Sequence, residues 1–533
     1  MAAKALEAGD TPNQPSHTCG DQYMATSRLE EARAGTINAD DLVLRANGHK
    51  PELRRQFNWL SALGLAFSIT NSWVGYLSNF GQNMAYGGPR LVIVGLVLAF
   101  SAQSIISIGL AEIGSAFPSS GGQYHFCFLL APKESRKFAG YVIGWMSVVI
   151  RYSPRRNDLS RHYQFLQPEL HGNAVADLSV LRGGSVIPVF VASKKVAFIC
   201  QITLLMSVVG VTITLFIPVG MQEYVRPGSF LVSPGTGIET GWGPGVSWML
   251  GICNAMYAFG GTDGALHIAE EMVNPGRRVP QIIMSTLLIG LVTTLPLFIA
   301  LLLFSTDTAA IVNSQLPSAE LLYQATGSRT VTMFLITWIL IVYISCLPSQ
   351  WVTSGRIAWA FARDNGTPFS PYFSTINPRL QFPVRTTTAA LVFVLLYGLL
   401  YLASTTAFNS IITSAVLFLN ITYAAPQGIL LVDRLRLLLA QTTSSMENSS
   451  ILPHRYLDLG LLGTFCNAFS ILWIIVLGVF VCFPPRLPVS VESANYTPAV
   501  VVGIFGIIVL FWVVSGRKMF TGPSVDWEGL RRA

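Results

Sequence analysis

Long apolar runs with few or no charged residues recur along this chain from residue 59 to the C-terminal region. Several of these runs reach the roughly 20 residues that a helix needs to cross about 30 Å of hydrocarbon. Only 11% of the 533 residues are charged, whereas soluble domains carry about 25%. So few charges cannot cover a water-facing surface, and we therefore expect an all-α integral membrane protein.

The hydropathy pattern predicts ten membrane spans, at residues 59 to 80, 90 to 116, 196 to 219, 246 to 266, 281 to 304, 331 to 361, 386 to 404, 409 to 432, 457 to 482 and 497 to 515. The membrane domain would extend from 51 to 517. Residues 1 to 50 are polar and lack the apolar core of a signal peptide, so they are interpreted as a disordered cytosolic tail. Residues 518 to 533 would form a cytosolic C-terminal tail.

Basic residues gather in short loops that all fall on one predicted side of the membrane, and the positive-inside rule makes that side cytosolic. Both termini are then cytosolic. This arrangement explains the net charge of +7 without a nucleic-acid partner. The seven cysteines show no paired spacing, and the sequence indicates neither a disulfide framework nor a metal site.

One region breaks the regular pattern of spans. Residues 138 to 150 are apolar but too few, because 13 residues of helix rise only about 20 Å. Residues 151 to 184 that follow are strongly polar. The sidedness of the later basic loops requires zero or two crossings between Lys137 and Lys194, and no second crossing is obvious.

Polar residues and glycine interrupt the first span, which reads SITNS at 68 to 72 and continues to Gly75. A helix in lipid must satisfy its own backbone, so such an interruption indicates an unwound stretch that faces a cavity lined by protein. The alternative is that these hydroxyl groups bond back to their own helix or join two helices. The sequence alone favours neither interpretation.

A stronger interruption lies in the fourth span, where residues 257 to 264 read YAFGGTDG. The charge of Asp263 has a high free-energy cost inside a membrane, so this side chain is expected to face a bundle interior or an aqueous path. Two interrupted helices in one chain are the pattern of a transporter's midplane site. The alternative is that Asp263 lies at the membrane interface and pairs with Arg277 or Arg278.

Three further residues are candidates for gating or coupling: Glu112, His267 and Glu270. A carboxylate at a helix end is more often solvated or paired, and a solvated helix end is the plainer interpretation of His267 and Glu270. A proton relay through His267 is the alternative, because histidine titrates near neutrality. The sequence has no nucleophile elbow, phosphate-binding loop or metal-spaced histidines, so we expect no enzymatic activity.

These motifs resemble those of the amino acid, polyamine and organocation transporter superfamily, and most closely its fungal branch of gamma-aminobutyrate, choline and amino acid permeases. The resemblance rests on FSITNSWVG at 67 to 75, GGP at 87 to 89, AEIGSAFPSSGGQY at 111 to 124, AFGGTDGALHIAEE at 258 to 271 and WAFARD at 359 to 364. It extends from about residue 51 to 517. Its one gap is the polar segment 151 to 184, where relatives carry the rest of helix three and all of helix four.

The resemblance implies an inverted-repeat bundle of nominally 12 helices, here 10 to 12, with helix three truncated and helix four replaced by the polar segment. It implies a secondary active permease for amino acids or amines such as gamma-aminobutyrate or choline, with alternating access, often proton-coupled, and a plasma-membrane location. A sensor that binds without transporting, or an inactive variant, is the alternative that the gap leaves open. The expected substrate-binding residues are Thr70, Asn71, Ser72, Trp73, Gly75, Tyr257, Phe259, Gly260, Gly261 and Asp263, with Tyr257 and Phe259 closing over the substrate.

Overall fold

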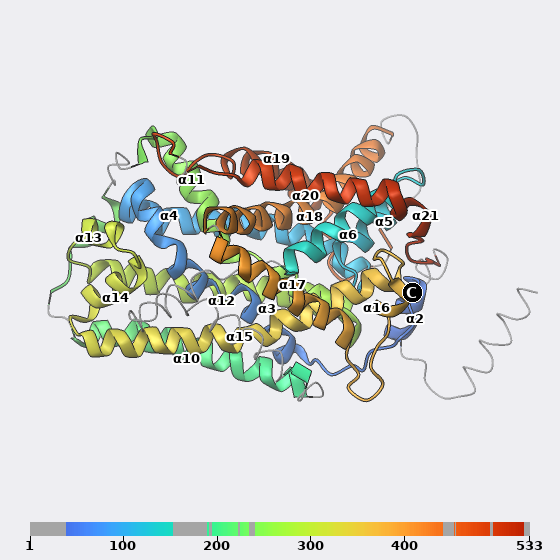
Figure 1. The fold of residues 1–533 in the computed structure, drawn as a ribbon, viewed down its shortest axis with the longest axis horizontal. Helices are drawn as coiled ribbons and strands as arrows, with labels where there is room; N and C mark the ends of the chain where they lie inside the picture. The colour runs from blue at the N-terminus through green and yellow to red at the C-terminus, as the bar shows by residue number, and fades with distance from the viewer. Residues whose placement is uncertain are drawn as a thin grey trace, which may run out of the picture.

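The computed structural model describes residues 39–152, 189–190, 195–221, 224–233, 240–403, 405–440, 452–453, 455–490 and 494–526. Within these residues the chain is helical, and its β-pairing is limited to two isolated bridges. Figure 1 shows long helices lying roughly along one direction of an elongated bundle. The prediction of an all-α membrane protein is confirmed.

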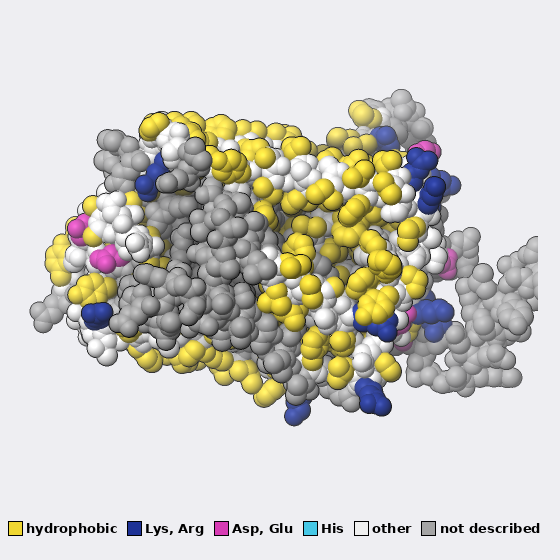
Figure 2. Space-filling view, viewed as in Figure 1, with side chains coloured by type: hydrophobic (Ala, Val, Ile, Leu, Met, Phe, Trp, Pro, Cys, Tyr) yellow, Lys and Arg dark blue, Asp and Glu magenta, His cyan; other side chains and the backbone are white. Residues whose placement is uncertain are grey.

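Seven described helical stretches are long and apolar enough to cross a membrane. One of them, Trp59–Ala116, contains two of the predicted spans, and Val384–Leu396 is a shorter apolar helix. The stretches are fewer than the ten predicted spans partly because the span predicted at 246 to 266 is broken into short pieces. Figure 2 shows hydrophobic side chains over the middle of the described surface and most of the visible Lys and Arg side chains toward one end.

The described residues form helical elements that are named here in chain order. They are α2 (Ala39–Ala46), α3 (Trp59–Thr70), α4 (Ser72–Ala116), α5 (Gln123–Leu130), α6 (Arg136–Tyr152), α10 (Val196–Met221), η3 (Gly228–Val232), α11 (Pro244–Ala255), η5 (Met256–Phe259), η6 (Thr262–Glu271), α12 (Pro275–Leu303), α13 (Thr308–Asn313), α14 (Pro317–Thr326), α15 (Arg329–Arg363), α16 (Ser370–Phe373), α17 (Val384–Ala403), α18 (Thr405–Ala440), α19 (Gly460–Phe480), α20 (Thr497–Phe511), η7 (Trp512–Gly516) and α21 (Arg517–Met519).

The first two predicted spans differ from the observed helices at their junctions. Helix α3 ends at Thr70 and α4 begins at Ser72, so a break lies inside the span predicted at 59 to 80. Helix α4 then bends at Gly87 and Gly88, where the backbone is not helical, and Pro89 follows. Gly88 has φ +65°, a conformation that glycine adopts without the steric cost of a side chain.

Helix α6 is longer than the apolar run that predicted it. The run covered 138 to 150, whereas α6 is the 17-residue helix Arg136–Tyr152. A basic residue is tolerated at its end because Arg151 finds an acidic partner inside the bundle. Of the polar segment predicted at 151 to 184, residues 153 to 184 lie outside the described structure.

Both described chain ends pack at the same end of the bundle. Residues 39 to 50, predicted as part of a disordered tail, include α2 and bury Leu44 and His49. The predicted C-terminal tail contributes Phe520, which is fully buried against Phe128. The backbone N–H of Asp526 donates to the carbonyl oxygen of residue 46 at 2.9 Å. These apolar anchors and backbone contacts hold both terminal segments against the bundle.

Candidate functional site

A small internal cavity lies where the two predicted helix breaks meet. It has a volume of about 30 Å³, which is room for about two water molecules. None of its lining residues carries a charged side chain. They are Ile69, Thr70, Asn71, Gly75, Tyr257, Gly260, Tyr343, Gln350, Val416 and Leu419.

The first break is a single residue in the left-handed conformation, Asn71 with φ +34°. Asparagine tolerates this conformation better than most residues because its short polar side chain bonds locally. Here its Oδ1 accepts from Ser207 Oγ at 3.0 Å and its Nδ2 donates to Cys346 Sγ at 3.2 Å. The break therefore places a helix C-terminus at Thr70 and a helix N-terminus at Ser72 beside the cavity, with partial negative and positive charge respectively.

The second break replaces the predicted continuous span by shorter pieces. Helix α11 ends at Ala255, η5 follows, Gly260 is extended, and Gly261 has φ +93°. This positive φ explains the glycine, because a side chain there would be strained. Both interruptions that the polar and glycine pattern predicted are thus present, and both border the cavity.

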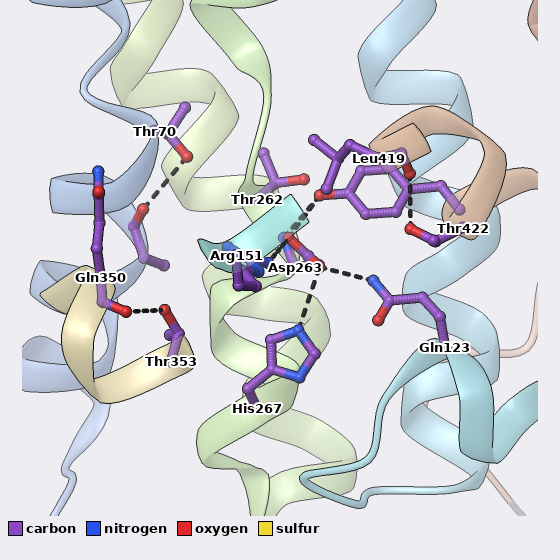
Figure 3. A network of polar contacts seen from close by, with 12 residues as sticks. Thr70, Gln123, Arg151, Thr262, Asp263, His267, Gln350, Thr353, Leu419 and Thr422 are labelled. Atoms are coloured by element: carbon purple, nitrogen blue, oxygen red, sulfur yellow. Dashed lines mark hydrogen bonds and ion pairs between the residues drawn. The ribbon is translucent and has the colours of Figure 1, made fainter. Parts of the chain in front are cut away.

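Asp263 lies in the first turn of η6, directly beyond the second break, and its carboxylate contacts four side chains (Figure 3). Tyr423 Oη donates to its Oδ1 at 2.6 Å and Gln123 Nε2 to its Oδ2 at 2.7 Å. His267 Nε2 lies 3.3 Å from Oδ2, and Arg151 forms an ion pair with Oδ1. Asp263 is 2% exposed, so its charge is held inside the bundle.

The alternative pairing of Asp263 with Arg277 or Arg278 is wrong. Its cationic partner is Arg151 rather than the two arginines suggested from the sequence. Arg277 instead lies over the ring of Tyr456, 5.2 Å from its centroid, and Arg278 donates to Gln281 at 3.4 Å. The physical reason is that η6 extends to Glu271 before α12 begins at Pro275, and this length of helix separates Asp263 from these arginines.

The structure separates the predicted binding residues into three groups. Thr70, Asn71, Gly75, Tyr257 and Gly260 line the cavity. Ser72, Trp73, Phe259 and Gly261 lie at the breaks but do not line it: Trp73 Nε1 donates to Ser207 Oγ at 2.9 Å, and Phe259 packs edge-on against Phe100. Asp263 and His267 form the neighbouring polar cluster.

Sequence reasoning missed the cavity residues contributed by α15 and α18, which are Tyr343, Gln350, Val416 and Leu419. Gln350 is notable because its buried Nε2 has no hydrogen-bonding partner in the described structure. A lone glutamine in the apolar run of α15 was the one available signal. The partners of Asp263 in α5, α6 and α18 were missed as well.

The two carboxylates predicted as gating candidates are buried and paired, as the plainer interpretation allowed for Glu112. Glu112 binds Arg434 at 2.7 Å and Arg455 at 3.2 Å. Both oxygens of Glu270 accept from Arg363, at 2.9 and 3.0 Å. The predicted solvation of Glu270 is therefore wrong, because η6 ends against α15.

The neighbouring Glu271 joins the entrance of α3 to the end of η6 and to α15. Its carboxylate pairs with the fully buried Arg356 and accepts from Gln56 Nε2 at 2.7 Å. Its backbone oxygen accepts from the N–H groups of Gln56 and Phe57, both at 3.1 Å. Together with Glu270 and Arg363, these residues form what we call the terminal ion-pair cluster.

Comparison with known proteins agrees with this architecture. The family model described as amino acid permease matches residues 57–507. The chain is 29% identical over 509 residues to the choline transporter of Saccharomyces cerevisiae, covering 92% of this chain and 87% of that protein. It is 26% identical to amino-acid permease BAT1 of Arabidopsis thaliana, covering 91% and 96%, and 26% identical to the 7-keto 8-aminopelargonic acid transporter of S. cerevisiae, covering 85% and 91%. The chain therefore belongs to the amino acid permease family.

Proposed function

We propose that this secondary transporter carries a small amine or amino acid, of the kind represented by choline, in the cavity between its two helix breaks. The observation that supports this site is that residues of both breaks line one cavity together with two tyrosines. Similar proteins are named as transporters of choline and of 7-keto 8-aminopelargonic acid and as amino-acid permeases. These names favour transport over sensing without translocation.

The electrostatics of the cavity suit a substrate that brings its own charge. Backbone carbonyls at the end of α3 would face a cationic group, and the N–H groups that begin α4 would face a carboxylate. Tyr257 and Tyr343 would attract a quaternary ammonium through their ring faces. The unpartnered Nε2 of Gln350 offers one hydrogen bond to a hydroxyl or carboxylate oxygen.

Binding requires the cavity to widen, because about 30 Å³ holds only about two waters. We propose that the terminal ion-pair cluster closes one end of the transport path. It ties the entrance of α3 and the end of η6 to α15, and these are the segments that lead to both breaks. Alternating access would then break these contacts when that end opens.

The membrane orientation and the driving force are also proposals. We propose that the end that carries both described chain ends faces the cytosol, which the basic residues of the loops support through the positive-inside rule. We propose a plasma-membrane location and coupling to protons, with His267 beside Asp263 as the candidate relay. Uptake in proteoliposomes with an imposed proton gradient tests the coupling: a proton-coupled carrier concentrates substrate only while the gradient persists.

The test of the site is uptake of labelled choline, gamma-aminobutyrate and neutral amino acids by cells that lack their own carriers. Gly260→Leu fills the cavity and is expected to abolish uptake of whichever substrate the wild type carries. Gly506→Leu is the matched control, because a side chain at residue 506 would meet nothing within 4 Å in α20. Surface labelling confirms that each variant reaches the membrane.

The substrate class is tested by a tyrosine pair. Tyr257→Ala is expected to raise KM for a quaternary amine by about fivefold to thirtyfold, which corresponds to a cation–π attraction of about 1 to 2 kcal/mol. Tyr323→Ala, at a residue 46% exposed in α14, is the control. Undiminished uptake by Gly260→Leu would rule out this cavity, whichever substrate is carried.

A further inference from the structure

Two histidines and an aspartate from distant parts of the chain meet at the end of the bundle that carries both described chain ends. His49 belongs to the segment between α2 and α3, His125 to α5, and Asp364 directly follows α15. One donor atom of each lies within 4.8 Å of the other two, and all three are buried. They lie outside the cavity and outside the terminal ion-pair cluster.

The spacing of the two imidazoles matches that of ligands sharing one ion. His49 Nε2 lies 3.4 Å from His125 Nδ1. Two ligands at about 2.0 to 2.1 Å from a tetrahedral zinc ion are about 3.3 Å apart. The same distance allows a hydrogen bond between the two rings, which a bound ion would replace.

The carboxylate is also placed to accept a cation. Tyr124 Oη donates to Asp364 Oδ2 at 3.0 Å. Oδ1 lies 3.9 Å from His49 Nδ1, and because an ion can bind only one nitrogen of His49, the relevant distance is the 4.8 Å within which one ligand atom of each of the three residues lies. The positive charge of Arg363 lies near the Asp364 carboxylate. Its guanidinium is already paired, because it donates to both oxygens of Glu270. Asp364 is 4% exposed, and a bound cation would offset the cost of burying the charge of its carboxylate.

Both side chains that would share the ion with the carboxylate are imidazoles, and the nitrogen of a neutral imidazole offers a lone pair to a metal. Two imidazoles with one carboxylate form a donor set suited to zinc and to neighbouring first-row metals.

We propose that His49, His125 and Asp364 form a binding site for a divalent transition metal such as Zn²⁺. A bound ion would join the segment that leads into α3 to α5 and to the end of α15. Because α3 ends at the first helix break, this link would slow the opening of that end of the transport path. The regulatory part rests on the proposed transport function, whereas metal binding does not.

Metal binding is tested on the purified full chain after removal of metals by a chelator. Co²⁺ is titrated and followed by its visible absorption, and Zn²⁺ is then added in competition. We expect saturation at one Co²⁺ per chain and displacement by Zn²⁺. His49→Gln and Asp364→Asn should each weaken binding by more than about tenfold, since losing a group that merely orients a ligand already costs that much.

Controls separate this site from binding elsewhere and from misfolding. Asp433→Asn removes a carboxylate of the exposed pair with Arg436 and should leave Co²⁺ affinity unchanged. Tyr124→Phe keeps the ring that packs on Phe361 and should weaken binding modestly. Absence of saturable Co²⁺ binding, or binding that His49→Gln and Asp364→Asn leave unchanged, would overturn the proposal.

The regulatory part is tested by uptake into proteoliposomes with Zn²⁺ on both faces. Zn²⁺ is expected to slow uptake by the wild type and to leave the rate of His49→Gln unaffected. If Zn²⁺ binds but both proteins transport equally fast, the link to opening is refuted while the metal site stands. A protein that binds Co²⁺ but shows no uptake of any substrate would instead contradict the proposed function.

Discussion

The buried pair of Arg151 and Asp263 allows a quantitative test of how the second helix break is held. Their side chains are 6% and 3% exposed. Replacing Asp263 by Asn keeps the side-chain shape but leaves the guanidinium of Arg151 without the anion to which it donates. Removing one partner of a buried ion pair costs about 3 to 5 kcal/mol, and we expect Asp263→Asn to lose this much unfolding free energy.

The reverse substitution should cost less, because the two partners are not equivalent. In Arg151→Met the carboxylate of Asp263 keeps donors from Tyr423, Gln123 and His267, and it can also take up a proton. The double variant removes both charges, so the two costs should not add. We expect a coupling free energy of about 2 to 3 kcal/mol, at the upper end for contacting residues.

The assay is reversible unfolding in mixed detergent micelles, applied to the wild type, both single variants and the double variant. The matched control is the pair Arg436 and Asp433, where Arg436 is 68% exposed. Asp433→Asn should change stability by no more than about 1 kcal/mol. If the costs at 151 and 263 add to within about 0.5 kcal/mol, the two residues do not act as a pair and the reasoning fails.

Two further predictions concern packing and closure. Gly64→Ala should lower the free energy of unfolding by about 1 to 3 kcal/mol, because a Cβ at residue 64 would lie 2.5 Å from the backbone oxygen of Cys200. Thermal unfolding in detergent measures this change. The control is Gly503→Ala, which should not destabilise the protein because a Cβ at residue 503 would meet open space. Glu271→Gln should destabilise the protein by about 3 to 5 kcal/mol, because Arg356 is fully buried; a thermal unfolding temperature equal to that of the wild type would show that this pair contributes nothing.

The helix breaks were predictable because their residues conflict with their surroundings. Asn71 and Gly261 lie in apolar runs, where polar and glycine residues weaken a helix, and both adopt positive φ. Asp263 stood out for the same reason, since a charge inside a membrane needs a partner. Local composition was sufficient to predict that a cavity would lie beside these two segments.

The partners across the cavity could not be predicted in the same way. Arg151 and Asp263 are 112 residues apart, and Tyr343 resembles any aromatic residue of an apolar helix. Such contacts depend on how helices pack, which periodicity does not specify. The same limit applies to His49 and Asp364, which come together only because the N-terminal segment folds back over the end of α15.

The contact between the two described chain ends also affects the thermodynamics of transport. The N–H of Asp526 bonds to the oxygen of Ala46, and Phe520 is buried beside α5. If this end opens by separating these segments, their contact free energy adds to the difference between the closed and open states. Each 1.4 kcal/mol changes that population ratio tenfold. Permeases with similar binding sites but different terminal segments would therefore spend different fractions of time open to that side.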